Sequence, residues 1–283
     1  MGHQKDRYTK IAMNTALIGL SNNISSNISK IKVWANSFQR YSDGAVVLLC
    51  ANSTNDEMKL CADIGIVPVQ VSISDTWYIN HERLKYTYEF LNKSNNDLVI
   101  VTDVFDVIFQ GNPFDKLDTE NYDVFVSGEG VKVSEEPWNS DNINKIFPEY
   151  YQACKEIEVI NSGIIAGNRT TVSQLIFQMY QLCESGSNAH NIKDQASLIT
   201  LIANKKIDRL KIFNLDDAWA MHCAVAGPTQ FFTGWGFDKK IKYGIPRLEN
   251  GSVVNKFGAK YDIVHQFNRV PDWQSILEKD YHE

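Results

Sequence analysis

Two carboxylates three residues apart, Asp103 and Asp106, stand between two apolar runs of the sequence. The runs Val99-Ile100-Val101 and Val107-Ile108-Phe109 favour strands, and the first is apolar enough to be buried on both faces. Because a buried unpaired carboxylate is very costly, the acids must lie where the strand emerges, and the carboxyl ends of strands bind ligands in open α/β sheets. Two hard oxygen donors there suit Mg²⁺ or Mn²⁺, which in turn would bind a substrate diphosphate. An isolated pair with this spacing also fits a simple turn cap.

Four further polar segments have residue types that suit the same site. They are Ser127-Gly128-Glu129-Gly130 with the later Pro137-Trp138, Asn161-Ser162-Gly163, Asp194-Gln195 at a predicted helix start, and 262–269, in which a predicted strand ends on His265. The glycines allow the backbone to approach a ligand closely, and the acids, amides and imidazole supply donors and acceptors.

The elements that must position these residues belong to an ordinary globular chain. Of its 283 residues, 43% are apolar and 22% are charged, and the net charge of −6 without a basic cluster argues against nucleic-acid binding. Five cysteines without metal-ligand spacing indicate reduced, buried thiols in a cytosolic protein. The polar stretch 1–10 resembles neither a signal peptide nor an anchor, and the apolar runs are too short to span a bilayer. Any membrane contact is therefore expected to be peripheral.

Strand and helix patterns alternate along the chain. We expect strands at 11–20, 45–50, 67–71, 122–127, 159–167, 209–215 and 261–264, and helices beginning at a Ser25 or Ser26 cap and at an Asn55 cap and at 81–91, 171–183 and 194–203. This alternation predicts an α/β protein with a largely parallel sheet and right-handed crossovers. The stretch 226–258 has weak periodicity and is expected to be a substrate-shaping loop region.

Taken together, these segments resemble glycosyltransferases of the GT-A fold. The nearest resemblance is to the glycosyltransferase domain of collagen lysyl hydroxylases and related microbial sugar transferases, and it runs in order from about Arg83 to Asn268. The matching positions are Asp103 and Asp106, Glu129 with Trp138, Asn161-Ser162-Gly163, Asp194-Gln195 and His265. The departures are Gly128 for the family's Ala, the reversed order of Pro137-Trp138, Ile164 for a second Gly, and 264–268 in place of His-Gly-Asn-Gly.

The resemblance implies a GT-A-like, Rossmann-type α/β fold, with a mostly parallel sheet flanked by helices in a single domain over 1–283 with two lobes. It assigns about 10–167 to nucleotide-sugar binding and 168–283 to the acceptor half and the histidine strand. It also implies a metal-dependent glycosyltransferase that moves a sugar from a UDP-sugar to a glycan or lipid-linked glycan, as in cell-surface polysaccharide synthesis. We expect this enzyme in the cytoplasm, at the inner face of a membrane.

The same resemblance gives each residue a role. Asp103, Asp106 and neutral His265 would hold Mn²⁺ or Mg²⁺ against the departing diphosphate. Donor binding is expected from Arg83, Thr102, Asp103, Asn161, Ser162, Gly163, Trp138, Gln195 and Asn268, and catalysis from Asp194 and Glu129.

Six of these residues also have a purely structural interpretation. Those interpretations are a solvated helix-face Arg83, a strand-end His265, a solvated loop Glu129, a capping Asp194, a core Trp138 and a turn-closing Asn161. Trp219 and His222 fit the acceptor side only weakly.

Two other functions compete with glycosyl transfer. A sugar-nucleotide nucleotidyltransferase also uses acidic metal sites, but the stretch Ile18-Gly19-Leu20-Ser21-Asn22 lacks the basic residues that hold a nucleoside triphosphate. A carbohydrate-binding protein without catalysis is the second alternative, and the presence of both aspartates and His265 argues against it. Release of UDP from UDP-sugars with and without Mn²⁺ separates these functions.

Overall fold

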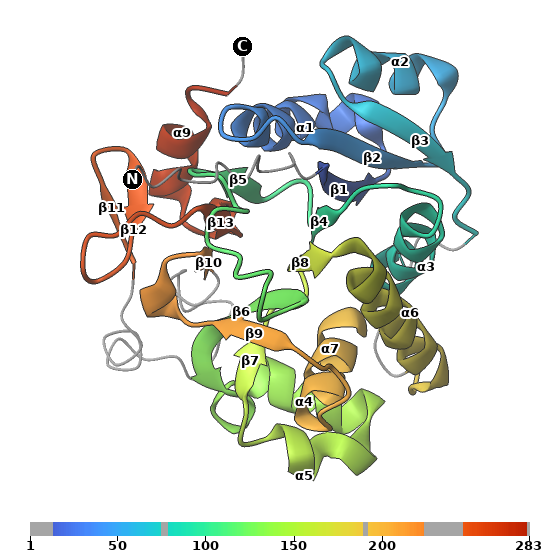
Figure 1. Ribbon diagram of the computed structural model, residues 1–283, viewed down its shortest axis with the longest axis vertical. Helices are drawn as coiled ribbons and strands as arrows, with labels where there is room; N and C mark the ends of the chain where they lie inside the picture. Colours follow the sequence, from blue (N-terminus) through green and yellow to red (C-terminus); the bar gives the residue numbers. More distant parts are fainter. Residues whose placement is uncertain (1–13, 75–78, 189–191, 224–245, 282–283) are drawn as a thin grey trace, which may run out of the picture.

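An eight-stranded sheet runs through the part of the chain that the computed structural model describes, residues 14–74, 79–188, 192–223 and 246–281 (Figure 1). Its strands, in spatial order, are β3 (Val67–Val71), β2 (Ala45–Ala51), β1 (Thr15–Ser21), β4 (Leu98–Thr102), β8 (Ile164–Asn168), β6 (Val124–Lys132) and β7 (Glu158–Ile160), with β9 (Leu210–Phe213) also paired to β6. Strands β3, β2, β1 and β4 are parallel to one another, and β9 is parallel to β6. Strand β8 runs antiparallel to β4 and β6, and β7 antiparallel to β6. The predicted mostly parallel α/β sheet is confirmed.

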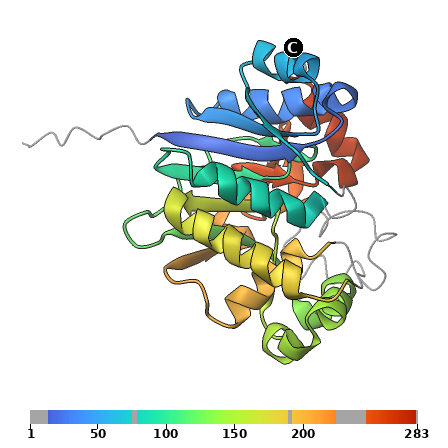
Figure 2. The ribbon, with the colours of Figure 1, turned by 90° about the vertical axis from the view of Figure 1, so that its right-hand side faces the viewer.

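Helices cover both faces of this sheet. They are α1 (Ile24–Gln39), α2 (Asn55–Asp63), α3 (Ile79–Leu91), α4 (Pro137–Ile146), α5 (Tyr151–Cys154), α6 (Arg169–Ser185), α7 (Asp194–Ala203) and α9 (Pro271–Glu278). Figure 2 shows α3 and α6 side by side across one face. Because side chains alternate along a strand, Ala16 and Ile18 of β1 pack in the core that α3, α6 and α7 share, whereas Leu17 packs with Trp34 and Phe38 of α1.

A small second sheet places residues from the C-terminal part of the described chain next to the segment that follows β4. It consists of β10 (Ala220–His222), β13 (Ile263–His265) and β5 (Val107–Phe109), in that order. Strand β13 is parallel to β10 and antiparallel to β5, which places His222 and Val107 on either side of His265. A hairpin of β11 (Arg247–Glu249) and β12 (Ser252–Val254) lies next to it in sequence.

Several helix and strand boundaries in the structure differ from those predicted from the sequence. The N-cap of α1 is Asn23 in the left-handed region, with φ of 52°, so Ser25 and Ser26 lie inside the helix. The N-cap of α2 is Thr54, because its hydroxyl and Glu57 form a reciprocal capping box. The predicted strand 159–167 is interrupted between β7 and β8, because residues 161–163 turn out of the sheet. Residues 11–13 and 226–245 of two predicted segments lie outside the described residues, and 246–258 holds the hairpin instead of an irregular loop.

Two further expectations concern cysteines and membrane spans. All five cysteines are buried and free of disulfides, as expected from their spacing. Within the described ranges, no helix has the length and apolar character needed to cross a membrane.

Both halves of the sequence build the main sheet, since β9 pairs with β6 and α6 and α7 cover the face shared with α3. The assignment of these halves to donor and acceptor stays a prediction.

Candidate active site

A pocket of about 530 Å³ opens beside the end of β4. The residues that line it come from both halves of the sequence, and most of them are acidic, amide or basic. They are Asn80, Arg83, Asp103, Asp106, Glu129, Trp138, Asn139, Asn161, Ser162, Gly163, Ile192, Asp194, Gln195, His265, Gln266 and Arg269.

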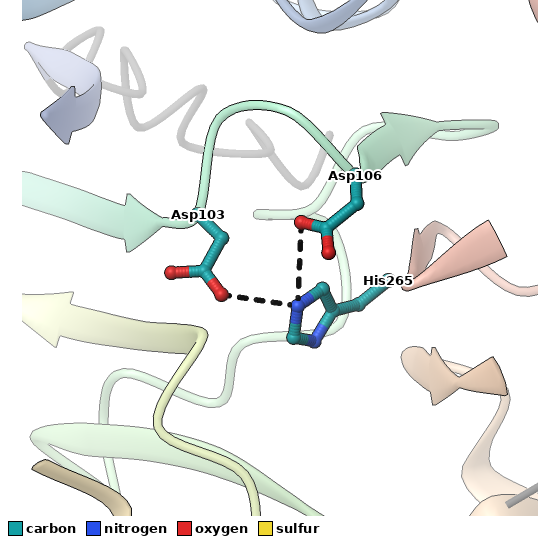
Figure 3. Close-up of side chains that lie close together, drawn as sticks. All are labelled: Asp103, Asp106 and His265. Carbon is teal, nitrogen blue, oxygen red and sulfur yellow. Dashed lines mark hydrogen bonds and ion pairs between the residues drawn. The ribbon is translucent and has the colours of Figure 1, made fainter. Parts of the chain in front are cut away.

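Asp103, Asp106 and His265 converge at one end of this pocket, which we call the cation end (Figure 3). The Nε2 atom of His265 lies 3.1 Å from Oδ2 of Asp103 and 3.6 Å from Oδ1 of Asp106. One oxygen of each carboxylate and one imidazole nitrogen all lie within 4.8 Å of one another. The three side chains therefore offer a divalent cation two carboxylate oxygens and one imidazole nitrogen, as their types in the sequence suggested.

Backbone pairing produces this convergence. Asp103 follows β4 and Asp106 precedes β5, whose first residue, Val107, pairs with His265 of β13. The backbone N–H of Gln266 donates to the carbonyl of Asp106 at 2.7 Å, which joins the two segments directly beyond the strands. Residues 159 positions apart in sequence are thus held together by main-chain hydrogen bonds.

Gly163 lies directly against Asp103 and His265 at the cation end. Its backbone carbonyl accepts a hydrogen bond from the N–H of Asp103 at 2.9 Å. A Cβ atom at this position would lie 2.4 Å from Cε1 of His265 and 2.8 Å from Oδ2 of Asp103. Only glycine therefore fits here without displacing two candidate ligands.

A second buried histidine lies behind His265. The Nδ1 atoms of His222 and His265 are 2.9 Å apart, and Nε2 of His222 is 2.6 Å from Oγ of Ser127. The expectation that Trp219 and His222 line the acceptor side is wrong. Trp219 is fully buried against Phe213 with ring centroids 4.7 Å apart, and its indole N–H donates to the carbonyl of Pro113 at 2.9 Å, which keeps it in the core.

The charges at the cation end are strongly coupled. Although burial opposes it, the Arg83 guanidinium, together with His265, holds the pKa of Asp103 well below its usual range. Burial raises the pKa of Asp106, and the charge of Asp103 adds to this. Burial alone would lower the pKa of His265, but the carboxylates of Asp106 and Asp103 raise it. Burial lowers the pKa of His222, so this imidazole stays neutral.

Arg83 joins the cation end to the rest of the pocket. One of its nitrogens bonds Asp103, and the other lies 2.6 Å from Oδ2 of Asp194. Ser162 donates to the same Asp194 oxygen at 3.0 Å. The solvated helix-face interpretation of Arg83 is wrong, because 19% of its side chain is exposed and both ends of its guanidinium are paired with acids.

Asp194 is the first residue of α7 and does not cap it. The N-cap is Lys193, and no side chain caps the helix there. Asp194 is 3% exposed and lines the pocket, and its Oδ1 atom has no hydrogen-bond partner among the described residues. The capping interpretation of Asp194 is therefore wrong, and one buried oxygen of this pocket-lining residue has no hydrogen-bond partner among the described residues.

A second set of pocket side chains, which we label the sugar end for the role proposed for it, consists of Asp194, Gln195, Asn139, Glu129 and Asn161. The amide of Asn161 donates to Glu129 at 2.7 Å, and that of Gln195 donates to Asn139 at 2.8 Å. Glu129 lies inside β6 with 6% exposure, so it is no solvated loop acid. Burial raises the pKa of Glu129 to about 7. Asn161 also accepts the N–H of Gly163 at 2.7 Å, so it both closes a turn and lines the pocket.

The structure places one of three other predicted donor-binding residues at the pocket and two outside it. Trp138, at the start of α4, is 37% exposed and lines the pocket, so it is not a core residue. Thr102 is buried and accepts a hydrogen bond from Nε1 of Trp34 at 2.9 Å, because strand alternation turns it toward α1. Asn268 lies on a short 3-10 helix (Phe267–Arg269) and does not line the pocket, unlike Arg269. The structure therefore does not bring Thr102 and Asn268 to the site.

Sequence reasoning assigned no role to five pocket residues, Asn80, Asn139, Ile192, Gln266 and Arg269. It considered His222 only for the acceptor side and missed its contact with His265. Asn139, Gln266 and Arg269 neighbour predicted site residues in sequence, and that proximity was the available signal. Nothing local to His222 identifies its partner, because the pairing of β10 with β13 brings them together.

The fold is that of GT-A glycosyltransferases. The galactosyltransferase LgtC in complex with donor and acceptor sugar analogs superimposes with a TM-score of 0.57 and 12% identity, covering 94% of this chain and 95% of that one. An active-site mutant of LgtC gives a TM-score of 0.56 and 11% identity, covering 88% and 86%. The bifunctional glycosyltransferase WbbM gives a TM-score of 0.53 and 12% identity, covering 90% of this chain and 46% of WbbM. No protein-family profile and no curated protein matches the sequence.

Proposed function

We propose that this protein is a glycosyltransferase that moves a sugar from a UDP-sugar to a glycan acceptor and requires a divalent metal ion. The observation that carries the proposal is the convergence of Asp103, Asp106 and His265 in the pocket. The likeness of the fold to LgtC and WbbM supports it. Those matches favour glycosyl transfer over nucleotidyl transfer, since both proteins are glycosyltransferases.

The cation end suits Mn²⁺, with Mg²⁺ as the second choice. Carboxylate oxygens fit both ions, and Mn²⁺ accepts an imidazole nitrogen more readily than Mg²⁺ does. A bound cation would neutralise charge on the departing diphosphate as a Lewis acid. Arg83 and Arg269 also line the pocket and add positive charge for the same diphosphate.

The sugar end is where we place the transferred sugar. Ring hydroxyls need donors and acceptors in fixed positions, and Asp194, Gln195, Asn139 and Glu129 supply both kinds. Asp194 is the proposed catalytic carboxylate, because it lines the pocket and its buried Oδ1 atom has no hydrogen-bond partner among the described residues. Glu129 is the second, because a carboxyl group with a pKa of about 7 both gives and takes protons near neutral pH.

We place the acceptor beside Trp138, whose half-exposed ring borders the pocket. An aromatic plane offers the apolar face of a sugar ring a stacking surface. The acceptor class we propose is a glycan or lipid-linked glycan, as in cell-surface polysaccharide synthesis, reached from the cytoplasm at the inner face of a membrane. This acceptor class rests on analogy with related sugar transferases.

The test is a donor screen. Purified protein is incubated with a panel of UDP-sugars and simple glycan acceptors, with Mn²⁺, with Mg²⁺ and with chelator, and UDP release and product mass are measured. We expect turnover with one UDP-sugar, greatest with Mn²⁺ and lost in chelator. Pyrophosphate release from UTP and a sugar phosphate would instead establish nucleotidyl transfer. Calorimetric sugar binding without turnover of any donor would contradict the proposal.

A further inference from the structure

Three buried side chains form a linear chain that ends at the candidate cation ligand His265. His222 and His265 are 0% and 1% exposed, and Ser127 is 1% exposed. The hydrogen-bond distances along this chain are 2.6 Å from Ser127 Oγ to His222 Nε2 and 2.9 Å between the two Nδ1 atoms. The last nitrogen, Nε2 of His265, faces Asp103 and Asp106 (Figure 3).

Strand pairing determines this arrangement. His222 and His265 are partners in the parallel register of β10 and β13, and their rings meet edge to face at 86°. Ser127 lies on β6 of the main sheet, so His222 connects the two sheets behind the pocket. Neither His222 nor Ser127 lines the pocket. Any effect of His222 on a bound cation must therefore act through His265.

The chain of hydrogen bonds constrains where each proton is. Each hydrogen bond holds one proton, so the two Nδ1 atoms share a single proton. A cation needs the lone pair on Nε2 of His265, which leaves the proton of a neutral His265 on Nδ1. His222 must then accept at its own Nδ1 and carry its proton on Nε2, where it donates to Ser127. One tautomer at each ring satisfies all four imidazole nitrogens of the chain.

We propose that His222, held by Ser127, is a positioning residue that fixes the tautomer and the orientation of His265 so that Nε2 is presented to the metal ion. This inference rests on the proposed metal-dependent function and adds a residue outside the pocket to it. Outer partners of metal-binding histidines commonly change metal affinity by about 10–100-fold when they are removed.

A histidine that serves only to fill the core makes a different prediction. For such a residue, any substitution of similar shape would preserve Mn²⁺ binding as long as the protein folds. His222→Phe retains a ring and removes the acceptor, whereas His222→Asn retains an acceptor near the position of Nδ1. The two variants thus separate packing from hydrogen bonding.

The experiment measures Mn²⁺ affinity by calorimetry in the full chain, without any sugar donor. We expect His222→Phe to bind Mn²⁺ about 10–100-fold more weakly, Ser127→Ala to show a smaller loss, and His222→Asn to recover most of the wild-type affinity. Met221→Leu is the matched control, because Met221 is equally buried on β10 but points away from the histidine pair. Thermal unfolding of the metal-free proteins shows which variants fold.

A spectroscopic readout tests the tautomer itself. In protein with ¹⁵N-labelled histidine and the diamagnetic probe Zn²⁺, we expect protonated Nδ1 at His265 and protonated Nε2 at His222. Wild-type Mn²⁺ affinity in folded His222→Phe, or a proton on Nε2 of His265 in the Zn²⁺ form, would overturn the positioning role and leave the proposed function intact. Absence of Mn²⁺ and Zn²⁺ binding in the wild type would overturn both.

Discussion

The two ends of the pocket are built in different ways. At the cation end, Asp103, Asp106 and His265 come from the termini of β4, β5 and β13, and backbone hydrogen bonds determine their spacing. At the sugar end, Asp194 and Asn139 come from the first turns of α7 and α4. Arg83 and Ser162 bond Asp194, and Gln195 bonds Asn139. The cation end is thus tied to the register of the sheets, whereas the helix residues of the sugar end depend on individual side-chain partners.

This difference indicates where the site tolerates change. Shifting a candidate cation ligand requires shifting a strand, so we expect the metal chemistry to be insensitive to substitutions elsewhere on the surface. A change of one amide at the sugar end alters the hydrogen bonds offered to a hydroxyl without moving the backbone. Donor and acceptor preference should therefore be adjustable at the sugar end while the cation end stays constant. Arg83 is the direct link, because it bonds acids of both ends.

The largest expected effect is at the cation end. Asp106→Asn removes a charged ligand but keeps its shape, and we expect kcat/KM to fall about a thousandfold or more and Mn²⁺ affinity to fall with it. Donor turnover and calorimetry measure the two quantities. Asp115→Asn, at an exposed position in the loop after β5, is the control and should behave as wild type. Full activity of Asp106→Asn in chelator would remove the metal from the mechanism.

At the sugar end, Asp194→Asn should lower kcat by roughly a hundredfold while Mn²⁺ affinity stays near wild type. The reason is that the amide loses the charge and the acceptor at Oδ1, while its oxygen keeps the acceptor position that Arg83 and Ser162 use and so preserves the link to Asp103. Single-turnover kinetics separate this loss from a change in product release. Asp141→Asn, on the exposed side of α4, is the control. Wild-type turnover in Asp194→Asn would end the proposed role of the carboxylate.

A substitution at the border of the two ends tests the steric argument. Gly163→Ala places a Cβ atom within 2.4 Å of the His265 ring. Because His222 contacts His265 on the side away from the pocket, His265 has little room to move away from this Cβ atom. We therefore expect the candidate cation ligands to be displaced and Mn²⁺ affinity to drop about tenfold. Calorimetry on folded protein measures it. Unchanged affinity would show that the cation end is more deformable than its strand construction implies.

Glu129 gives the sugar end a pH dependence of stability. Its pKa is raised from 4.5 to about 7 in the folded protein, so between these values the native state binds more protons than the unfolded state. Stability therefore falls as pH rises through this window, by on the order of 3 kcal/mol from this group alone. Glu129→Gln should remove that slope. Chemical denaturation in chelator from pH 4.5 to 8 measures it, and an unchanged slope in the variant would contradict the assignment.

The smallest effect tests the exclusion of Thr102 from the site. Thr102→Val leaves the buried Nε1 of Trp34 without a partner, which should cost about 1–3 kcal/mol of stability and leave Mn²⁺ and UDP affinity unchanged. Thr102→Ser keeps the hydroxyl and should restore most of the stability. Weaker UDP binding by folded Thr102→Val would return this residue to the donor site.

Much of the fold follows from local pattern. The strand Val67–Val71 and the helix Asp194–Ala203 begin and end where the sequence predicts, because apolar alternation, helical spacing and glycine are local signals. Helix starts differ by one or two residues where a neighbour caps better, as Thr54 does for α2. The acids after an apolar strand were recognisable for the same reason, since cost of burial alone places them at a strand end.

What the sequence determined by itself is therefore the α/β alternation, the acidic pair and the order of the polar segments. Tertiary structure decided which of these residues meet: Arg83 pairs with Asp194 across 111 positions, and Ser127 pairs with His222 across 95. It also decided that Thr102 turns toward Trp34, 68 positions away. The physical reason is that hydrogen-bond partners and burial depend on strand register between distant segments, and propensity and periodicity describe only neighbours along the chain.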